Sequence, residues 1–238
     1  MKRLAACLML FAAACEGPLQ REAAPEAPDA SPPQSKCVAR RAPESIADMV
    51  ALLNALPKPV TLPCVLEALP HPLSINAANS VLSAQPAVGK RSPRIFLFLN
   101  DLMLSVVPAG MGSRLLEFGE RRSDTHTLKA ELEFPIETEL DSGSPYTRLP
   151  FEGASNSSCG FCHIEQEQAQ DVGHAYARIS HAIRPMPAQR VSLVELQAEL
   201  ANCDAAQEPE RCAMLEAIFG PNRKALDAEF PKQWKTFF

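Results

Sequence analysis

The sequence is poor in aromatic residues and has no excess of basic ones. Among its 238 residues there are one Trp and two Tyr, which argues against a carbohydrate-binding face lined by aromatic rings. The formal net charge is −5, and no stripe of Lys and Arg is present. The chain therefore lacks the electrostatic footprint of a nucleic-acid-binding protein. Its hydrophobic content of 46% is ordinary for a globular chain.

The apolar run at the N-terminus is too short for a transmembrane helix. It extends from Leu4 to Ala14, whereas a helix needs roughly 20 apolar residues to cross a bilayer. A basic head, Lys2-Arg3, precedes the run, and small residues end it. This order of features predicts a secretory signal peptide at residues 1–14, so we expect the chain to leave the cytoplasm.

Small residues followed by cysteine, Ala12-Ala13-Ala14-Cys15, resemble the lipobox of bacterial lipoproteins. The resemblance implies that Cys15 becomes the first mature residue and carries a lipid. Leu4-Ala5-Ala6-Cys7 fits the lipobox better by letter, but no apolar stretch precedes it. We therefore expect the protein in the cell envelope, lipid-anchored to a membrane and facing the periplasm or the cell exterior. The alternative is an ordinary secreted protein that is cleaved nearby.

Residues 15–36 predict a disordered tether behind the lipidated cysteine. This Pro/Ala-rich segment contains five prolines and several charges, and it has no periodic apolar face that could offset the entropy cost of ordering. Pro-rich linkers are extended, at about 3.1 Å per residue. The remaining chain is interpreted as a helical and β-rich part, 37–140, and a part that carries the principal motif, 141–238.

Four of the eight cysteines are expected to form disulfides, because the predicted compartment is oxidising. Proximity in sequence favours the pairs Cys37–Cys64 and Cys203–Cys212. Four cysteines allow three pairings, and sequence alone does not choose among them.

The predicted fold class is α+β. Apolar spacing indicates an N-terminal helical pair at 45–56 and 63–69. Alternating patterns then predict the strands of an antiparallel β meander with one buried face. These strands cover 73–77, 94–99, 102–107, 114–120 and 128–134. We interpret this β-region as a docking or support module, because its sequence shows no catalytic triad and no metal-ligating cluster.

The C-terminal region is predicted to be helical. A helix is expected over 164–183. Ser192 and Glu195 have the spacing of a capping box, which predicts a second helix to about residue 202. Pro209 suits the first turn of a third helix that ends at Phe219, before Gly220-Pro221.

The strongest chemical signal is Cys159-Gly160-Phe161-Cys162-His163. Two thiols two residues apart can add to the two vinyl groups on one edge of a porphyrin. The next residue then lies beneath the ring, where an imidazole nitrogen can bind the iron. Cys-x-x-Cys-His is the pattern of covalent haem attachment.

This pentapeptide and its surroundings resemble c-type cytochromes. The resemblance implies one covalent haem c, with thioether bonds to Cys159 and Cys162 and proximal ligation by His163. Met186, in Pro185-Met186-Pro187, resembles the methionine loop of that family and is one candidate for the sixth iron ligand. His174 or His181, or an open coordination site, are the alternatives. On a straight helix both histidines would share the face of His163, which disfavours them.

These features predict an exported, lipid-anchored mono-haem protein that acts in electron transfer or redox sensing. The expected partners are the membrane, through the lipid anchor, and a redox partner protein, with no nucleic acid. Such a protein would be an electron carrier rather than a catalyst. The main alternative is a non-haem envelope lipoprotein, acting as a binding or structural module with a Cys159–Cys162 disulfide. A haem peroxidase is a third possibility, but it needs an acid–base group that the sequence does not show.

Overall fold

The computed structural model describes residues 37–236, except 39–40, 82, 151–157 and 164. The predicted signal peptide, the lipidation site Cys15 and the tether, residues 1–36, lie outside the described residues. Within the described part of the chain, no helix combines the length and the hydropathy needed to cross a membrane.

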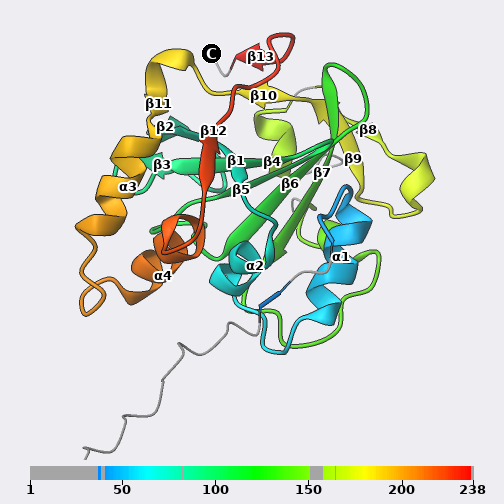
Figure 1. Cartoon of the computed structure of the whole chain (residues 1–238). Coiled ribbons are helices and arrows are strands. Elements are labelled where there is room, and N and C mark those ends of the chain that lie inside the picture. The colour runs from blue at the N-terminus through cyan, green and yellow to red at the C-terminus, as the bar shows by residue number, and fades with distance from the viewer. Residues whose placement is uncertain (1–36, 39–40, 82, 151–157, 164, 237–238) are drawn as a thin grey trace, which may run out of the picture. The chain divides into compact units, whose positions relative to one another are not determined.

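A nine-stranded mixed sheet dominates the fold (Figure 1). Its central part is an antiparallel succession of strands in the order β1-β4-β5-β6-β7. Their bounds are β1 (Leu73–Ala78), β4 (Arg94–Leu99), β5 (Leu102–Val106), β6 (Leu115–Arg121) and β7 (His126–Glu133). Leu99 pairs with Leu102, so Asn100 and Asp101 form the two-residue turn that the sequence indicates.

Strands from the C-terminal half extend this sheet at both ends. β9 (Arg178–His181) pairs antiparallel with β7, and β8 (Glu167–Gln168) pairs with β9. At the other end, β11 (Arg190–Val191) and β12 (Ala225–Asp227) both pair with β1, and β12 runs parallel to it. Two small sheets pair β2 (Ser80–Val81) with β3 (Ala87–Val88), and β10 (Ile183–Arg184) with β13 (Lys235–Thr236).

Three of the α-helices begin at caps that the sequence contains. The α-helices are α1 (Ile46–Ala55), α2 (Leu62–Ala68), α3 (Leu193–Ala201) and α4 (Pro209–Phe219). Ser45 and Thr61 cap α1 and α2 through their side chains, and Ser192 forms the predicted capping box with Glu195. Short 3-10 helices are η1 (Ser144–Tyr146), η2 (Ser158–Phe161), η3 (Gln170–Val172) and η4 (Pro187–Gln189).

The main core lies between one face of the sheet and the helices α1, α2 and α4. Met49 and Leu66 from the helices and Leu97, Leu104 and Leu128 from the strands are fully buried there. Along β4, for example, the core residues Ile95 and Leu97 alternate with Phe96, which belongs to a separate cluster, as expected for the two faces of a sheet. One face of the sheet is thus packed against this core.

The other face of the sheet is also partly covered, contrary to the expectation of one buried face. Phe230 packs edge-to-face on Phe96, with ring centroids 4.9 Å apart. Trp234 and Ala182 join this second cluster. The C-terminal tail and the segment after β9 therefore cover strand positions that alternation alone assigns to solvent.

The predicted fold class is wrong. The described residues form a mainly β fold, with a large mixed sheet and four α-helices, rather than a helical pair, a meander and a helical C-terminal region. The C-terminal region contributes six strands, β8 to β13, in addition to α3 and α4. These short strands are stabilised by hydrogen bonds to distant partners such as β1 and β7, which leave no local periodic signal.

The helix predicted over 164–183 is absent among the described residues of that range. The segment forms β8, η3 and β9, and Gly173 ends η3 in the left-handed region at φ 70°. That backbone conformation favours glycine and interrupts a right-handed helix. Ile179 then pairs with Leu128 of β7. It is therefore an apolar residue of a strand and not of a helix face.

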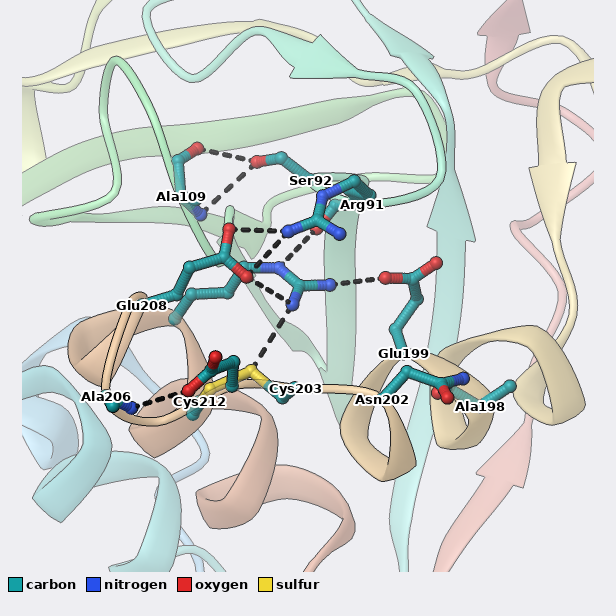
Figure 2. A network of polar contacts seen from close by, with 12 residues as sticks. Arg91, Ser92, Ala109, Ala198, Glu199, Asn202, Cys203, Ala206, Glu208 and Cys212 are labelled. Atoms are coloured by element: carbon teal, nitrogen blue, oxygen red, sulfur yellow. Dashed lines mark hydrogen bonds and ion pairs between the residues drawn. A yellow bond between two sulfur atoms is a disulfide. The ribbon is translucent and has the colours of Figure 1, made fainter.

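The structure contains both predicted disulfides, Cys37–Cys64 and Cys203–Cys212. The second joins the end of α3 to α4, where Figure 2 shows it beside Arg91, Glu199 and Glu208. It lies at the junction between the two C-terminal helices and the loop before β4.

Replacing Cys203 and Cys212 together by Ala is expected to lower the free energy of unfolding by about 2–3 kcal/mol. The reason is that the bond closes a short loop, with a sequence separation of 9, and so restricts the unfolded chain. Urea unfolding of the oxidised parent and the double variant measures the difference. Equal stability would show that the unfolded chain is already constrained without this bond.

Candidate functional site

The Cys-x-x-Cys-His motif forms a tight turn at η2. The backbone amides of Cys162 and His163 both donate to the carbonyl of Cys159, at 3.2 and 2.8 Å. This local winding brings the two cysteines and the histidine to one side of the chain. All three line the same hollow, which lies between the motif and the second face of the sheet.

We call this hollow the groove. Its cavity volume is about 90 Å³. Strands β4 to β7 contribute side chains to its walls, among them Arg94, Phe96, Met103, Glu117, Lys129 and Glu131. The other walls come from Val81, Ser83 and Ala84, from Cys159, Cys162 and His163 of the motif, and from the segment Ile183 to Pro185. The groove thus combines apolar side chains, charged side chains and the predicted haem-attachment residues.

His163 is held by one directed hydrogen bond. Its Nδ1 lies 2.7 Å from the carbonyl oxygen of His181. A carbonyl can only accept, so Nδ1 carries the proton and the lone pair lies on Nε2. Burial lowers the pKa of His163 well below its usual value, and the charge of Lys129 lowers this pKa further. The ring is therefore a neutral imidazole, the form that binds metals.

The two cysteines meet different surroundings in the groove. Burial raises the pKa of the Cys162 thiol, and this effect exceeds the opposing influence of Arg94. A thiol with a raised pKa is a weak nucleophile at neutral pH. Cys159 lies close enough to the Lys129 ammonium to affect its pKa electrostatically. Cys162 therefore does not resemble an activated catalytic cysteine.

A buried ion pair occupies one wall of the groove. The Arg94 guanidinium contacts the Glu117 carboxylate and donates to Ser105 Oγ at 2.8 Å. It also bonds Ser83 Oγ and lies 5.2 Å from the centroid of the Phe96 ring. Arg94 Nε is buried and has no hydrogen-bond partner in the described part of the protein.

Lys129 is the most deeply buried cation of the groove, with 5% of its surface exposed. Its Nζ donates to Thr127 Oγ1 at 2.5 Å and to the carbonyl oxygen of His181 at 3.4 Å. Burial lowers the pKa of Lys129 to about 8. The same carbonyl therefore accepts from both His163 and Lys129, which couples the motif to strand β7.

The three candidates for a sixth iron ligand lie away from the groove. Met186 is 38% exposed and lines a different hollow, beside Phe230. The ring of His174 packs near Tyr146, with centroids 5.5 Å apart. The ring of His181 bonds Glu165 at 2.6 Å and stacks on His126. The hydrogen bond from His163 goes to the backbone carbonyl of His181 and not to its ring.

Sequence reasoning missed Met103 and Lys129 as groove residues. Both residues alternate along their strands with core side chains. The predicted meander has one buried face, so these positions are expected on its uncovered face. Two buried positions, Lys129 and Glu131, are covered because residues far along the chain close over them. A charged residue between two apolar residues of a strand looks the same in the sequence whether or not a distant segment covers it.

The donor set of the motif fits a covalent haem, but the cavity does not enclose one. Two thiols and an imidazole with its Nε2 lone pair are the groups that attachment requires. The cavity of about 90 Å³ is far smaller than the ~300–1,000 Å³ of typical ligand pockets. A porphyrin therefore cannot be enclosed by the groove walls as they stand.

Among the described residues, no three His, Cys, Asp or Glu side chains are grouped so that they could hold a metal ion. Comparisons with protein families, with curated proteins and with solved structures found no match for this chain. The geometry of the groove is thus the basis for any statement about function.

Proposed function

We propose that this protein carries one covalent haem on Cys159, Cys162 and His163, and that it acts in electron transfer or redox sensing in the cell envelope. The lipid anchor predicted at Cys15 would hold it to a membrane, and a redox partner protein would exchange electrons with it. When bound, the haem iron supplies the reversible one-electron chemistry. The protein residues attach the group, orient it and set its surroundings.

The observation that carries the proposal is the hydrogen bond from His163 Nδ1 to the His181 carbonyl. A metal-ligating histidine usually donates its second ring nitrogen to a carbonyl or carboxylate, which fixes the tautomer and the ring orientation. Here the donating nitrogen leaves Nε2 for the iron. The two thiols on the same turn line the same groove as this ring.

The iron would have a second axial position that the present side chains do not determine. Met186, His174 and His181 keep other surroundings, as described above. Met103 is the thioether that lines the groove. An open site, or a ligand brought in by rearrangement around the haem, is consistent with the small cavity.

Protein produced with the cytochrome-maturation machinery is expected to give a haem-stained band on a denaturing gel, because thioether bonds survive denaturation. Replacing both Cys159 and Cys162 by Ala should abolish the stain. Replacing both Cys203 and Cys212 by Ala should retain it, since that pair forms a disulfide far from the motif in sequence. An unstained band from the parent chain, in cells that mature another c-type cytochrome, would refute covalent haem.

A non-haem envelope lipoprotein is the second candidate, and the small cavity favours it. In that case Cys159 and Cys162 would form a structural or redox disulfide in the final protein. Replacing His163 by Ala would then be nearly harmless, and the absorption spectrum would show no Soret band before or after reduction. A low-spin haem spectrum would instead indicate two strong axial ligands.

A further inference from the structure

The groove holds more positive than negative charge. Five ionisable side chains of the sheet and its cover line it: Arg94, Glu117, Lys129, Glu131 and Arg184. Glu117 pairs with Arg94, and Glu131 pairs with Arg148, which does not line the groove. Lys129 and Arg184 therefore remain without a carboxylate partner among the described residues.

Burying the Lys129 ammonium beside neutral acceptors is unfavourable. A charge taken out of water loses its hydration, and in real proteins the net cost is several kcal/mol unless an opposite charge compensates it. The partners of Lys129 Nζ are a hydroxyl and a carbonyl. With a pKa of about 8, Lys129 still carries its proton at pH 7. Such a cation in a hollow indicates that an anion binds there.

Two further donors lie in the same hollow. Arg94 is 7% exposed, and its Nε has no hydrogen-bond partner in the part of the chain that the structure describes. Arg184 uses Nε to bond the Trp234 carbonyl at 3.1 Å, so its terminal nitrogens can serve a ligand. Guanidinium groups bind carboxylates with particular strength, because two parallel N–H donors match the two oxygens.

The remaining wall is apolar. Phe96, Met103 and Ile183 line the groove beside these cations. Ligand sites combine apolar contact with a few polar groups that fix orientation. Because the cavity is only about 90 Å³, the groove would take the anionic end and the adjoining carbons of a ligand rather than a whole ligand. A ligand with both an apolar body and an anionic end matches the walls, whereas a small, fully hydrated anion would leave the apolar wall unused.

We propose that the groove binds the carboxylate of a largely apolar organic ligand, with Lys129 as its principal cation and Arg94 and Arg184 as further donors. The carboxylate could belong to a porphyrin propionate or to a free apolar acid, since both present the same chemistry. The inference does not depend on thioether attachment, because none of its three cations belongs to the motif.

The test uses the full chain with Cys159 and Cys162 both replaced by Ala, so that no covalent bond can form. Two matched pairs of probes are titrated at pH 7 in a calorimeter. Protoporphyrin IX, a dicarboxylate, is compared with its dimethyl ester, and decanoate is compared with decanol. Each acid is expected to bind more tightly than its neutral counterpart if it is the type of ligand that the groove accepts.

Adding Lys129→Met should weaken binding of that acid by about ten- to a hundredfold, the loss expected for a hydrogen bond between charged groups. The neutral analogue should be unaffected. Lys224→Met, which removes an exposed lysine that does not line the groove, should leave both affinities unchanged. Preference for protoporphyrin IX would identify a propionate site, and preference for decanoate would identify a free-acid site.

The proposal is overturned if neither acid binds at millimolar concentration, if acid and neutral analogue bind alike, or if Lys129→Met leaves the acid's affinity unchanged. These outcomes are separate from the haem-stain experiment. A stained band with no carboxylate preference would support covalent haem and refute the carboxylate site. Decanoate binding without a stained band would support the carboxylate site and refute covalent haem.

Discussion

Replacing Arg211 by Met is expected to lower the free energy of unfolding by about 3–5 kcal/mol, the loss typical of breaking a buried ion pair from one side. The Arg211 side chain is 3% exposed. Its guanidinium contacts the Glu199 and Glu208 carboxylates and donates to the Arg91 carbonyl at 2.9 Å. Removing it leaves the Glu199 carboxylate without its cation, and leaves Glu208 with Arg91 as its remaining partner among the described residues.

The contacts of Arg211 connect three parts of the fold. Arg211 lies on α4, Glu199 lies on α3, and Arg91 precedes β4. Figure 2 shows Glu199 and Glu208 converging from opposite sides beside the Cys203–Cys212 disulfide. One buried guanidinium therefore links both C-terminal helices to the sheet, and its five N–H donors allow it to serve all these acceptors.

The matched control is Arg91→Met. Arg91 also pairs with Glu208, but its side chain is 64% exposed, and solvent-exposed ion pairs add little to stability. Urea unfolding of the two variants should therefore differ strongly. Adding Glu199→Gln to Arg211→Met should recover part of the loss, because Gln needs no cation. Equal effects of Arg211→Met and Arg91→Met would show that burial of Arg211 is not what matters.

Replacing Lys129 by Met is expected to raise the stability of the ligand-free protein at pH 7 by about 2–3 kcal/mol. Burial lowers the pKa of Lys129 to about 8, from 10.5 for an ordinary lysine, and each unit of pKa corresponds to about 1.4 kcal/mol. Methionine has a similar length and needs no hydration. The loss of the bond to Thr127 offsets part of the gain.

The pH dependence has a definite sign. Between pH 8 and 10.5 the unfolded chain holds a proton on Lys129 that the folded chain has released, so the stability of the parent rises with pH in this window. The cost of the buried charge is fully present below pH 8. The advantage of Lys129→Met should therefore be largest at pH 7 and should vanish near pH 10.5.

Thermal or urea unfolding at pH 7, 9 and 10.5 measures this difference, with Lys224→Met as the exposed control. Charges near Lys129 also contribute, since Cys159 and Glu117 raise its pKa and Arg94 lowers it. A Lys129→Met variant that is less stable than the parent at every pH would contradict the burial of an uncompensated ammonium. With a bound carboxylate the sign should reverse, because the anion then needs Lys129.

Local features of the fold could be predicted from the chain. The capping box at Ser192, the turn at Asn100 and the helix that starts after Ser45 all appear where the sequence indicates them. Each depends on hydrogen bonds between residues a few positions apart. The disulfides Cys37–Cys64 and Cys203–Cys212 follow the same logic, because their partners are close in sequence.

The larger architecture could not be predicted in the same way. Strand β9 forms because it pairs with β7, about 50 residues earlier. Its own sequence carries only a weak apolar pattern, which is also compatible with a helix. β12 is a three-residue strand that pairs in parallel with β1. Short strands depend on partners that are distant in sequence, so the local sequence predicts neither that they are strands nor where they begin and end.

The Cys-x-x-Cys-His motif could be identified from the sequence alone, because its two thiols and its imidazole lie within five consecutive residues and a single turn brings them together. The surroundings of the motif were decided by the tertiary structure. The carbonyl that orients His163 comes from His181, and the cation beside it comes from Lys129 on β7. Residues that are close in sequence stay close in any fold. The hydrogen-bond partner of His163 and the buried charge of Lys129 depend instead on how distant strands pair.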